Sequence, residues 1–264
     1  MDLRLGSKRA LVTGSTAGIG FAAAARLAEE GASVIVNGRS TGRVEESVVR
    51  VRERAPEAEV SGVAANLGTA EGVEELLGQV PEVDILVNNL GIFEPKDFGE
   101  ITDADWFRFF ETNVMSGVRL ARHYLPGMKE RDWGRIVFVS SESAVQIPVE
   151  MIHYGVTKTA QLAIARGLAE TTVGTGVTVN SVLPGPTASE GVKTFVGQMA
   201  QQQGTDEAAM EEEFFRSARP SSLLQRFIEP GEVAEMITFV CSPVSSATNG
   251  ASLRADGGVV RSIV

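Results

Sequence analysis

A tyrosine and a lysine lie four residues apart in the stretch His153-Tyr-Gly-Val-Thr-Lys158. On a helix this spacing puts both side chains on one face, one turn apart. A cation beside a phenol favours the phenolate and lowers a pKa that is ordinarily about 10. We therefore expect Tyr154, assisted by Lys158, to exchange a proton with a carbonyl or alcohol oxygen. For the spacing alone, a solvated surface pair is the alternative interpretation.

A glycine-rich turn lies near the start of the chain. The apolar run Arg9–Thr13 precedes Gly14-Ser-Thr-Ala-Gly18-Ile-Gly20, and the helix-forming run Phe21–Glu30 follows and is closed by Gly31. Glycines let the backbone approach a pyrophosphate, and a helix N-terminus presents free N–H groups to it. Because a second apolar strand, Ser33–Asn37, comes next, the pattern favours a dinucleotide-binding unit over a simple tight turn.

Further motifs occur in order along the chain. They are Asn88-Asn-Leu-Gly91, Asn113, Ser141 thirteen residues before Tyr154, Pro184-Gly185 and Asp256-Gly-Gly258. With the glycine turn, written Thr-Gly-x-x-x-Gly-x-Gly, they resemble the short-chain dehydrogenase/reductase family over essentially the whole chain, and in particular its 3-oxoacyl-ACP reductase and carbonyl reductase members. Leu90 departs from the alanine usual in that family. The resemblance implies one α/β domain over residues 1–264, a Rossmann-type doubly wound parallel sheet of about seven strands with helices on both faces.

The resemblance also implies roles for individual residues. Tyr154 would be the general acid or base, and Lys158 would lower its pKa and hold the nicotinamide ribose. Ser141 would hydrogen-bond the carbonyl oxygen, and Asn113 would fix a water that connects Lys158 with solvent. The cofactor would lie against Thr13, Gly14, Thr16, Gly18, Ile19, Gly20, Arg39, Ser40, Asn66, Leu67, Asn88, Gly91, Tyr154, Lys158, Pro184, Gly185, Thr187 and Ser189.

The end of the second strand bears on the choice of cofactor. In the family alignment Gly38 takes the position of the acid that NAD enzymes use, and Arg39 takes that of a phosphate-binding arginine. A guanidinium binds phosphate in a bidentate way, which favours NADP(H). NAD(H) stays possible, because Ala17 is not basic and Asn66 replaces the usual aspartate. A polar turn with a helix cap at Thr41 is the structural alternative.

Apolar strand-like runs alternate with helical segments. The expected strands are Arg9–Thr13, Ser33–Asn37, Val60–Ala64, Val83–Asn88, Arg135–Ser140, Gly176–Leu183 and Ala251–Arg254, and the expected helices are Gly18–Glu30, Thr41–Arg54, Gly72–Gln79, Asp103–Arg131, His153–Thr172 and Pro230–Cys241. This alternation predicts a parallel sheet with right-handed crossovers. The motifs follow strands, so they should meet at the carboxyl ends of the sheet.

Segment 186–227 interrupts the alternation and is acidic around Asp206–Glu213. We expect it to form a lid over the substrate, and a surface insertion is the alternative. The largely apolar residues Phe93, Val145, Ile147, Ile152, Phe195, Val196 and Met199 are candidates for the pocket lining. His153 points away from Tyr154 on a helix and is expected to be a packing or pocket-rim residue rather than a base.

Composition limits the class of protein. The 264 residues are 43% hydrophobic and 22% charged, as in globular proteins, and the net charge of -10 argues against a nucleic-acid or anionic-membrane partner. The chain shows no signal-peptide core and no apolar run of membrane-spanning length. Cys241 is the single cysteine, and two histidines without clustered carboxylates predict no metal site. We expect a cytoplasmic protein.

These features predict an NADP(H)-dependent oxidoreductase that moves a hydride between the nicotinamide and a small-molecule ketone, 3-oxoacyl compound or secondary alcohol. The alternatives are a catalytically idle regulator on the same fold, an NAD-preferring alcohol dehydrogenase, and an isomerase or dehydratase. The two long helices carry apolar residues on more than one face, which favours a homodimer or homotetramer. The alternative is that all these residues serve the internal core.

Overall fold

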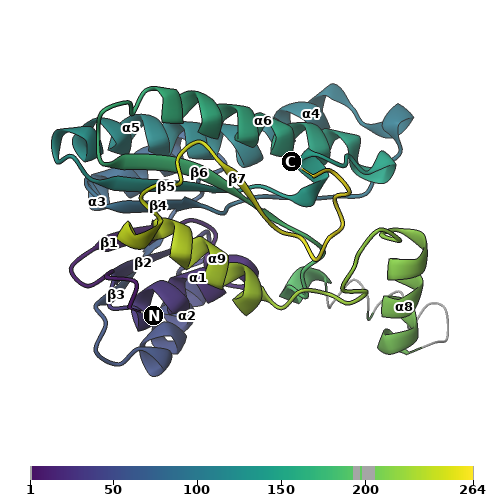
Figure 1. Cartoon of the computed structure of the whole chain (residues 1–264), viewed down its shortest axis with the longest axis horizontal. Coiled ribbons are helices and arrows are strands. Elements are labelled where there is room, and N and C mark those ends of the chain that lie inside the picture. The colour runs from purple at the N-terminus through teal and green to yellow at the C-terminus, as the bar shows by residue number, and fades with distance from the viewer. Residues whose placement is uncertain (1, 193–196, 198–205, 264) are drawn as a thin grey trace.

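The computed structural model of the chain describes residues 2–192, 197 and 206–263 (Figure 1). Its described strands form one sheet with the order β3-β2-β1-β4-β5-β6-β7, and every pairing is parallel. The strands are β1 (Arg9–Val12), β2 (Ser33–Gly38), β3 (Val60–Ala64), β4 (Ile85–Asn88), β5 (Gly134–Val139), β6 (Val177–Pro184) and β7 (Ser252–Ala255). The predicted seven-stranded doubly wound sheet is confirmed, with strand ends displaced by one or two residues.

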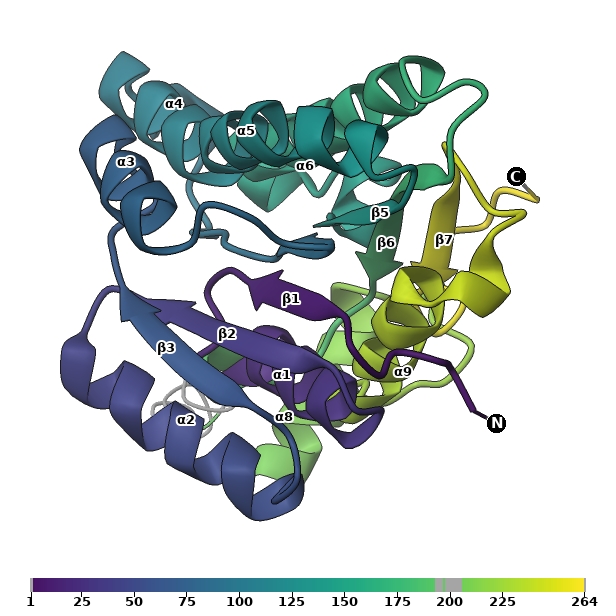
Figure 2. The same cartoon turned by 90° about the vertical axis from the view of Figure 1, so that its left-hand side faces the viewer.

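Helices cover both faces of the sheet (Figures 1 and 2). On one face lie α1 (Gly18–Glu29), α2 (Thr41–Arg54) and α9 (Pro230–Cys241); on the other lie α3 (Ala70–Gln79), α4 (Asp103–Phe110), α5 (Ser116–Glu130) and α6 (Ile152–Glu170). Neighbouring residues of a strand point to opposite faces, so Val12 joins the core under α1 while Leu11 joins the core under α5. Burial on both faces explains why these strands read as continuous apolar runs.

The segment predicted as one helix, Asp103–Arg131, has three parts. A π-helical turn, Glu111–Met115, separates α4 from α5, so the prediction of an uninterrupted helix was wrong. The Asn113 side chain accepts a hydrogen bond from the backbone N–H of Ile92 at 2.7 Å and donates to the Ile92 carbonyl at 3.0 Å. These contacts with the loop after β4 hold Asn113 inward and stabilise the wider turn. Such turns are frequent at functional sites.

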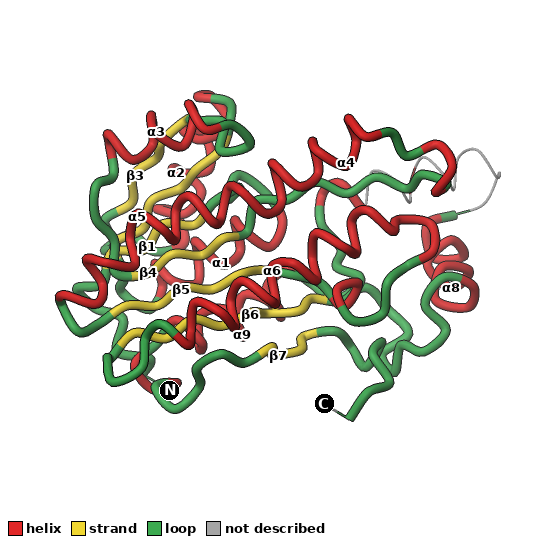
Figure 3. The backbone as a smooth tube through the Cα atoms, turned by 90° about the horizontal axis from the view of Figure 1, so that it is seen from above, coloured by secondary structure: helices red, strands yellow, loops and turns green. Residues whose placement is uncertain are grey.

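The strand order reverses between β1 and β4, so the carboxyl ends of β1, β4, β5 and β6 gather around one crevice. Short 3₁₀ turns precede α4 at Phe98–Glu100, follow β5 at Glu142–Ala144, precede α6 at Val149–Met151 and follow α9 at Pro243–Ser245. Helix α8 (Glu207–Ser217) and α4 lie at one end of the molecule, beyond the sheet (Figure 3). None of the helices in the described ranges is both long and apolar enough to cross a membrane.

The two ends of the segment between β6 and α9 lie side by side. Thr187 pairs with Ile228 in a parallel bridge, and the Ile228 N–H donates to the Pro186 carbonyl at 2.9 Å. Within the segment, the rings of Phe214, Phe215 and Phe227 pack together with centroids 5.1–5.2 Å apart. The pocket candidates Phe195, Val196 and Met199 lie outside the described residues.

Candidate active site

The glycine turn after β1 has the shape that a pyrophosphate needs. Gly14 and Gly18 adopt φ values of 60° and 56°, which favour glycine. A Cβ on Gly20 would lie 2.4 Å from Asn89 Nδ2 and 2.5 Å from the Gly14 carbonyl oxygen. Helix α1 begins at Gly18, and its N-cap residue, Ala17, supplies no side-chain cap. The first N–H groups of the helix are therefore available to an anion.

Thr13 and Asn89 join the two strands on either side of the crevice. The Thr13 hydroxyl oxygen accepts hydrogen bonds from the backbone N–H groups of Asn89 at 2.9 Å and Leu90 at 3.0 Å. Asn89 Nδ2 donates to the carbonyl oxygens of Thr13 at 2.9 Å and Gly14 at 3.0 Å. These bonds fix the glycine turn against the end of β4, so Asn89, absent from the sequence-based site list, shapes the cofactor site.

The residues expected around the adenosine lie at the ends of β2 and β3. Arg39 and Ser40 are exposed, and Ser40 is the N-cap of α2 without a side-chain capping bond. Gly38 faces Thr16, whose Cγ2 would be 2.5 Å from a Cβ at that position. Asn66 is exposed, whereas the Leu67 side chain is buried in the core and leaves only its backbone near the crevice.

The end of the crevice where the nicotinamide is expected is also crowded. A Cβ on Gly91 would be 3.3 Å from Lys158 Nζ, and one on Gly185 would be 2.5 Å from the carbonyl oxygen of Asp256. The buried Thr187 hydroxyl donates to the Gly185 carbonyl at 2.9 Å. Ser189 lies across from the turn, its Cβ 3.3 Å from where a Cβ of Gly18 would be. The backbone thus approaches the crevice closely at both ends, which fits an extended dinucleotide.

Ser141, Tyr154 and Lys158 meet at the base of this crevice. Ser141 follows β5, and the other two lie one turn apart on α6, as the spacing predicted. The Ser141 hydroxyl hydrogen-bonds the Tyr154 phenol and favours its ionised form. Lys158 Nζ lies 5.6 Å from the centre of the Tyr154 ring, and Lys158 is 4% exposed.

The pKa expected for the phenol was wrong. Burial raises the pKa of Tyr154 to about 12, and Ser141 only partly opposes this effect. Burial also lowers the pKa of Lys158 to about 8. The Lys158 ammonium donates to the Val139 carbonyl at 3.0 Å and to Gln161 Oε1 at 3.3 Å, so it is not directed at the phenol oxygen. Desolvation therefore outweighs the neighbouring cation in this structure.

Asn113 is buried beside these groups, but its side chain is fully used. Besides its bonds to Ile92, its amide donates to the Thr157 hydroxyl at 3.0 Å. Its backbone carbonyl accepts a hydrogen bond from Gln161 Nε2 at 2.6 Å. Gln161 thus bridges Asn113 and Lys158 directly. The sequence analysis missed Gln161, although a polar residue one turn beyond Lys158 on the same helix is a usable signal.

Asn88 and His153 are both buried. Asn88 is 4% exposed, and its amide carbon lies 3.2 Å from where a Cβ of Gly117 would be. His153 is fully buried with its ring 4.0 Å from that of Phe109 and 6.1 Å from that of Trp106, and burial lowers its pKa. The predicted packing of His153 is confirmed. That it does not act as a base stays a prediction. The described residues contain no group of three or more side chains suited to hold a metal ion.

A cavity of about 660 Å³ extends from the glycine turn, at Ile19, to Tyr154. Its apolar wall comprises Ile92, Phe93, Pro95, Val192, Met210, Phe214 and Phe227. Phe93 was expected there, but the described lining does not include Val145, Ile147 or Ile152. Val145 and Ile147 are 49% and 44% exposed because the turn before α6 directs them outward.

A polar cluster, Arg219–Glu142–Glu150, also lines the cavity. Arg219 Nε donates to Glu142 Oε1 at 3.0 Å, and Nη1 donates to Glu150 Oε1 at 3.3 Å. Arg219 and Glu142 are 8% and 3% exposed. Burial raises the pKa of Glu142, and Arg219 opposes that rise. The cluster ties the segment after α8 to the residue next to Ser141.

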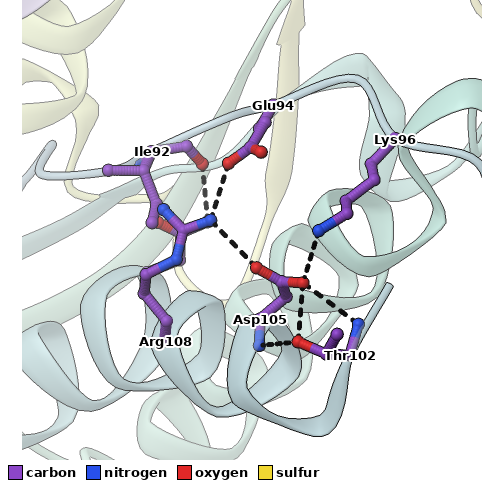
Figure 4. Close-up of polar contacts among 7 residues, drawn as sticks. Ile92, Glu94, Lys96, Thr102, Asp105 and Arg108 are labelled. Carbon is purple, nitrogen blue, oxygen red and sulfur yellow. Dashed lines mark hydrogen bonds and ion pairs between the residues drawn. The ribbon is translucent and has the colours of Figure 1, made fainter. Parts of the chain in front are cut away.

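Ion pairs hold the loop after β4, which supplies one wall of the cavity, against α4 (Figure 4). Lys96 Nζ lies 2.7 Å from Asp105 Oδ2, and Arg108 Nη2 lies 2.6 Å from Glu94 Oε2 and 3.4 Å from Asp105 Oδ1. Asp105 also forms a capping box with Thr102 at the start of α4. Its contacts with Lys96 and Thr102 hold the pKa of the Asp105 carboxyl well below its usual range.

Known proteins resemble the chain over its full length. The family model described as short chain dehydrogenase matches residues 8–200. An uncharacterized oxidoreductase, YvaG of Bacillus subtilis, is 52% identical over 263 residues and all of both chains. The 3-oxoacyl-[acyl-carrier-protein] reductase FabG of Aquifex aeolicus is 31% identical over 98% of this chain and 100% of its own length. An L-sorbose reductase from Gluconobacter frateurii, solved with NADPH and L-sorbose, superimposes with a TM-score of 0.93 at 30% identity over all of both chains.

The chain belongs to the short-chain dehydrogenase family and is an oxidoreductase of that family. The fold, the glycine turn and the close backbone approaches fit the nicotinamide cofactor that this family uses.

Proposed function

We propose that the protein is an NADP(H)-dependent oxidoreductase that interconverts a ketone and a secondary alcohol. The proposal rests mainly on one observation: one continuous cavity joins the glycine turn to Ser141, Tyr154 and Lys158. A dinucleotide in the crevice and a carbonyl compound above Tyr154 would share this space. The large apolar pocket with a few convergent polar groups is typical of a substrate site.

The nicotinamide, when bound, supplies or accepts the hydride. Tyr154 gives its phenolic proton to the carbonyl oxygen in reduction and takes the proton back in oxidation. Ser141 Oγ accepts a hydrogen bond from the Ser143 N–H at 3.1 Å, so its own proton, which bonds the Tyr154 phenol in this structure, can turn to a substrate oxygen. That bond stabilises the negative charge that develops on the oxygen.

Lys158 and Asn113 support this proton transfer. The Lys158 ammonium stabilises the phenolate and holds the ribose hydroxyls of the cofactor. Because burial disfavours the phenolate in this structure, the role proposed for the Lys158 ammonium is to offset part of that cost while the proton is transferred. Asn113 stabilises the π-helical turn. Its carbonyl also holds Gln161, which in turn positions the Lys158 ammonium.

The preference for NADP(H) rests on Gly38 and Arg39. An acidic side chain at position 38 would meet Thr16, so the crowding disfavours the residue that would bind the ribose of NAD. Arg39 is exposed at the adjacent position, where its guanidinium can reach a 2′-phosphate. A preference for NAD(H) is the alternative.

We infer that the described parts of the segment 186–227 cover the substrate end of the cavity, and that the enzyme is cytoplasmic. The inference is supported by Met210 and Phe214 of α8, which line the cavity, and by Arg219, which reaches Glu142.

The proposal is tested by replacing Tyr154 with Phe and following NADPH absorbance with a panel of ketones. Tyr154→Phe removes the transferable proton and should lower turnover by at least about 10²-fold. Tyr124→Phe is the matched control, since the Tyr124 hydroxyl bonds the Val80 carbonyl far from the cavity; it should keep its turnover. Near-normal turnover in Tyr154→Phe would refute the assignment. Cofactor binding without turnover of any ketone by the wild type would favour the idle regulator.

A further inference from the structure

The Arg219–Glu142–Glu150 cluster lies close to the reacting centre. Glu142 is next to Ser141, Glu150 is four residues before Tyr154, and all three members line the cavity. The charges of both Glu142 and Arg219 act on the Tyr154 phenol. Because Glu142 adjoins Ser141 and the cluster lines the same cavity as Tyr154, a substrate group that touches the cluster would lie near the carbonyl carbon.

The cluster has unused hydrogen-bonding capacity of both kinds. Glu142 Oε2 is buried and has no hydrogen-bond partner within the described chain. The bonds that Arg219 makes there use Nε and Nη1, and a guanidinium has further N–H donors. Glu150 is half-buried and accepts a bond from Arg219 through Oε1. Free donors beside free acceptors suit hydroxyl groups, because a hydroxyl both donates and accepts.

The charge balance of the described lining disfavours an anionic substrate. Lys158 serves the phenol and the cofactor, and Arg219 is already paired with two carboxylates. Glu213 adds a further carboxylate to the lining. A carboxylate or phosphate near the carbonyl would meet these acids without an unpaired cation to receive it.

We propose that the Arg219–Glu142–Glu150 cluster is a hydroxyl-binding subsite, and that the substrate is a neutral ketone with hydroxyl groups next to its carbonyl. This inference rests on the proposed function and narrows it to polyhydroxylated ketones over alkyl ketones, oxo acids and 3-oxoacyl thioesters. The apolar wall at Phe93, Met210 and Phe214 would pack against the C–H groups of such a substrate. A plain alkyl ketone would leave the buried Glu142 oxygen unpaired.

The test compares four-carbon ketones with the full-length enzyme and NADPH. The substrates are erythrulose, which is hydroxylated and open-chain, butan-2-one, acetoacetate and the acetoacetyl N-acetylcysteamine thioester. We expect kcat/KM for erythrulose to exceed that for butan-2-one by at least about 100-fold, because a site built to bind a hydroxyl rejects the analogue that lacks it. D-fructose and hexan-2-one repeat the comparison with a longer chain.

Variants connect this selectivity to the cluster. Arg219→Met and Glu150→Gln should each reduce the erythrulose-to-butan-2-one ratio by at least about 10-fold, mainly through the KM for erythrulose. Arg219→Lys should lose part of the ratio, since an ammonium lacks the guanidinium fork. Arg226→Met is the matched control, because Arg226 is exposed and pairs with Glu232 outside the described lining; the ratio should not change. Thermal melting checks that each variant folds.

Three results would overturn the subsite. One is a kcat/KM for butan-2-one, acetoacetate or the thioester that equals or exceeds the value for erythrulose. Another is an unchanged erythrulose-to-butan-2-one ratio in both Glu150→Gln and Arg219→Lys. These two variants keep the shape or the charge of the cluster, so they test the subsite even if Arg219→Met does not fold. The third is turnover of none of these ketones by the wild type, which would refute the proposed function together with the subsite. Turnover without selectivity for hydroxyl groups would refute the subsite alone.

Discussion

Gln161 is expected to be a positioning residue for Lys158, and Gln161→Leu tests this role. Leucine has nearly the same volume but removes both hydrogen bonds, the one from Lys158 at 3.3 Å and the one to the Asn113 carbonyl at 2.6 Å. Lys158 and Asn113 are 4% and 1% exposed, so water cannot readily replace the lost partner. An unsatisfied buried group costs about 1–3 kcal/mol, and two such groups predict a loss of about 2–6 kcal/mol in the free energy of unfolding.

The same substitution should change the pH dependence of catalysis. Burial lowers the pKa of Lys158 to about 8, and the Gln161 oxygen favours the charged form. Reduction needs the ammonium, so kcat/KM for the ketone should fall as the pH rises through the Lys158 pKa. This fall should move to lower pH in Gln161→Leu, which removes an acceptor, and to higher pH in Gln161→Glu, which adds a negative charge.

Two measurements check these effects. Urea unfolding followed by tryptophan fluorescence gives the free energy of unfolding, and NADPH absorbance across pH gives the rate profile. Gln79→Leu is the matched control, because Gln79 is exposed at the end of α3, and both quantities should stay at their wild-type values. A merely structural Gln161 would lower stability without moving the profile. Identical alkaline limbs in the wild type, Gln161→Leu and Gln161→Glu would refute the positioning role.

Three further predictions concern the cofactor, the buried lysine and assembly. Arg39→Ala should weaken NADPH binding by about 1.5–3 kcal/mol in calorimetry and hardly affect NADH; a wild type that binds both cofactors equally well would contradict the NADP(H) preference. Because burial lowers the pKa of Lys158 from 10.5 to about 8, the unfolded chain binds more protons between these values, and the free energy of unfolding should rise with pH there relative to Lys158→Met. Equal slopes in urea titrations would argue against the lowered pKa. The protein should sediment as a homodimer or homotetramer, since Phe107 and Phe110 of α4 are 75% and 44% exposed; a stable mass near 28.0 kDa at micromolar concentration would exclude such assembly.

Much of the fold and site could be predicted because their signals are local. The glycine pattern predicts a tight turn, and this turn accounts for the positive φ values at Gly14 and Gly18 and for the crowding at Gly20. The pairing of Tyr154 and Lys158 follows from helix geometry alone. Both predictions needed only residues that are close together along the chain.

The predictions that failed depend on contacts between distant residues. The π-helical turn at Asn113 is held by Ile92, which is 21 residues away, so helix periodicity predicts α4 and α5 as one element. The raised pKa of Tyr154 depends on burial and on where the Lys158 ammonium points, and spacing fixes neither. Arg219 reaches Glu142 across 77 residues, and no local pattern links the two.

The apolar residues of the long helices were interpreted either as a subunit interface or as part of the internal core. The structure divides them between these two interpretations. Phe109 and Val114 are buried in the protein's own core, which supports the internal alternative for those residues. Phe107 and Phe110, on either side of Phe109 in α4, are exposed, and Val173 beyond α6 is 79% exposed. Periodicity shows that a helix has two apolar faces, but it does not show which of them the sheet covers.

The bridge between Thr187 and Ile228 makes the segment between them exchangeable. The two ends are held together by backbone hydrogen bonds that do not depend on side chains, and the Thr187 hydroxyl is directed at Gly185. The entropy of closing a flexible loop grows slowly, by about 0.6 kcal/mol for each doubling of its length. Other segments can therefore be grafted between these two residues, provided that they keep the contact of Ser189 with the glycine turn and a partner for the buried Glu142 carboxylate. Substrate selectivity can then change through residues such as Met210 and Phe214 while the strands and the glycine turn stay in place, both in natural divergence and in engineered chimaeras.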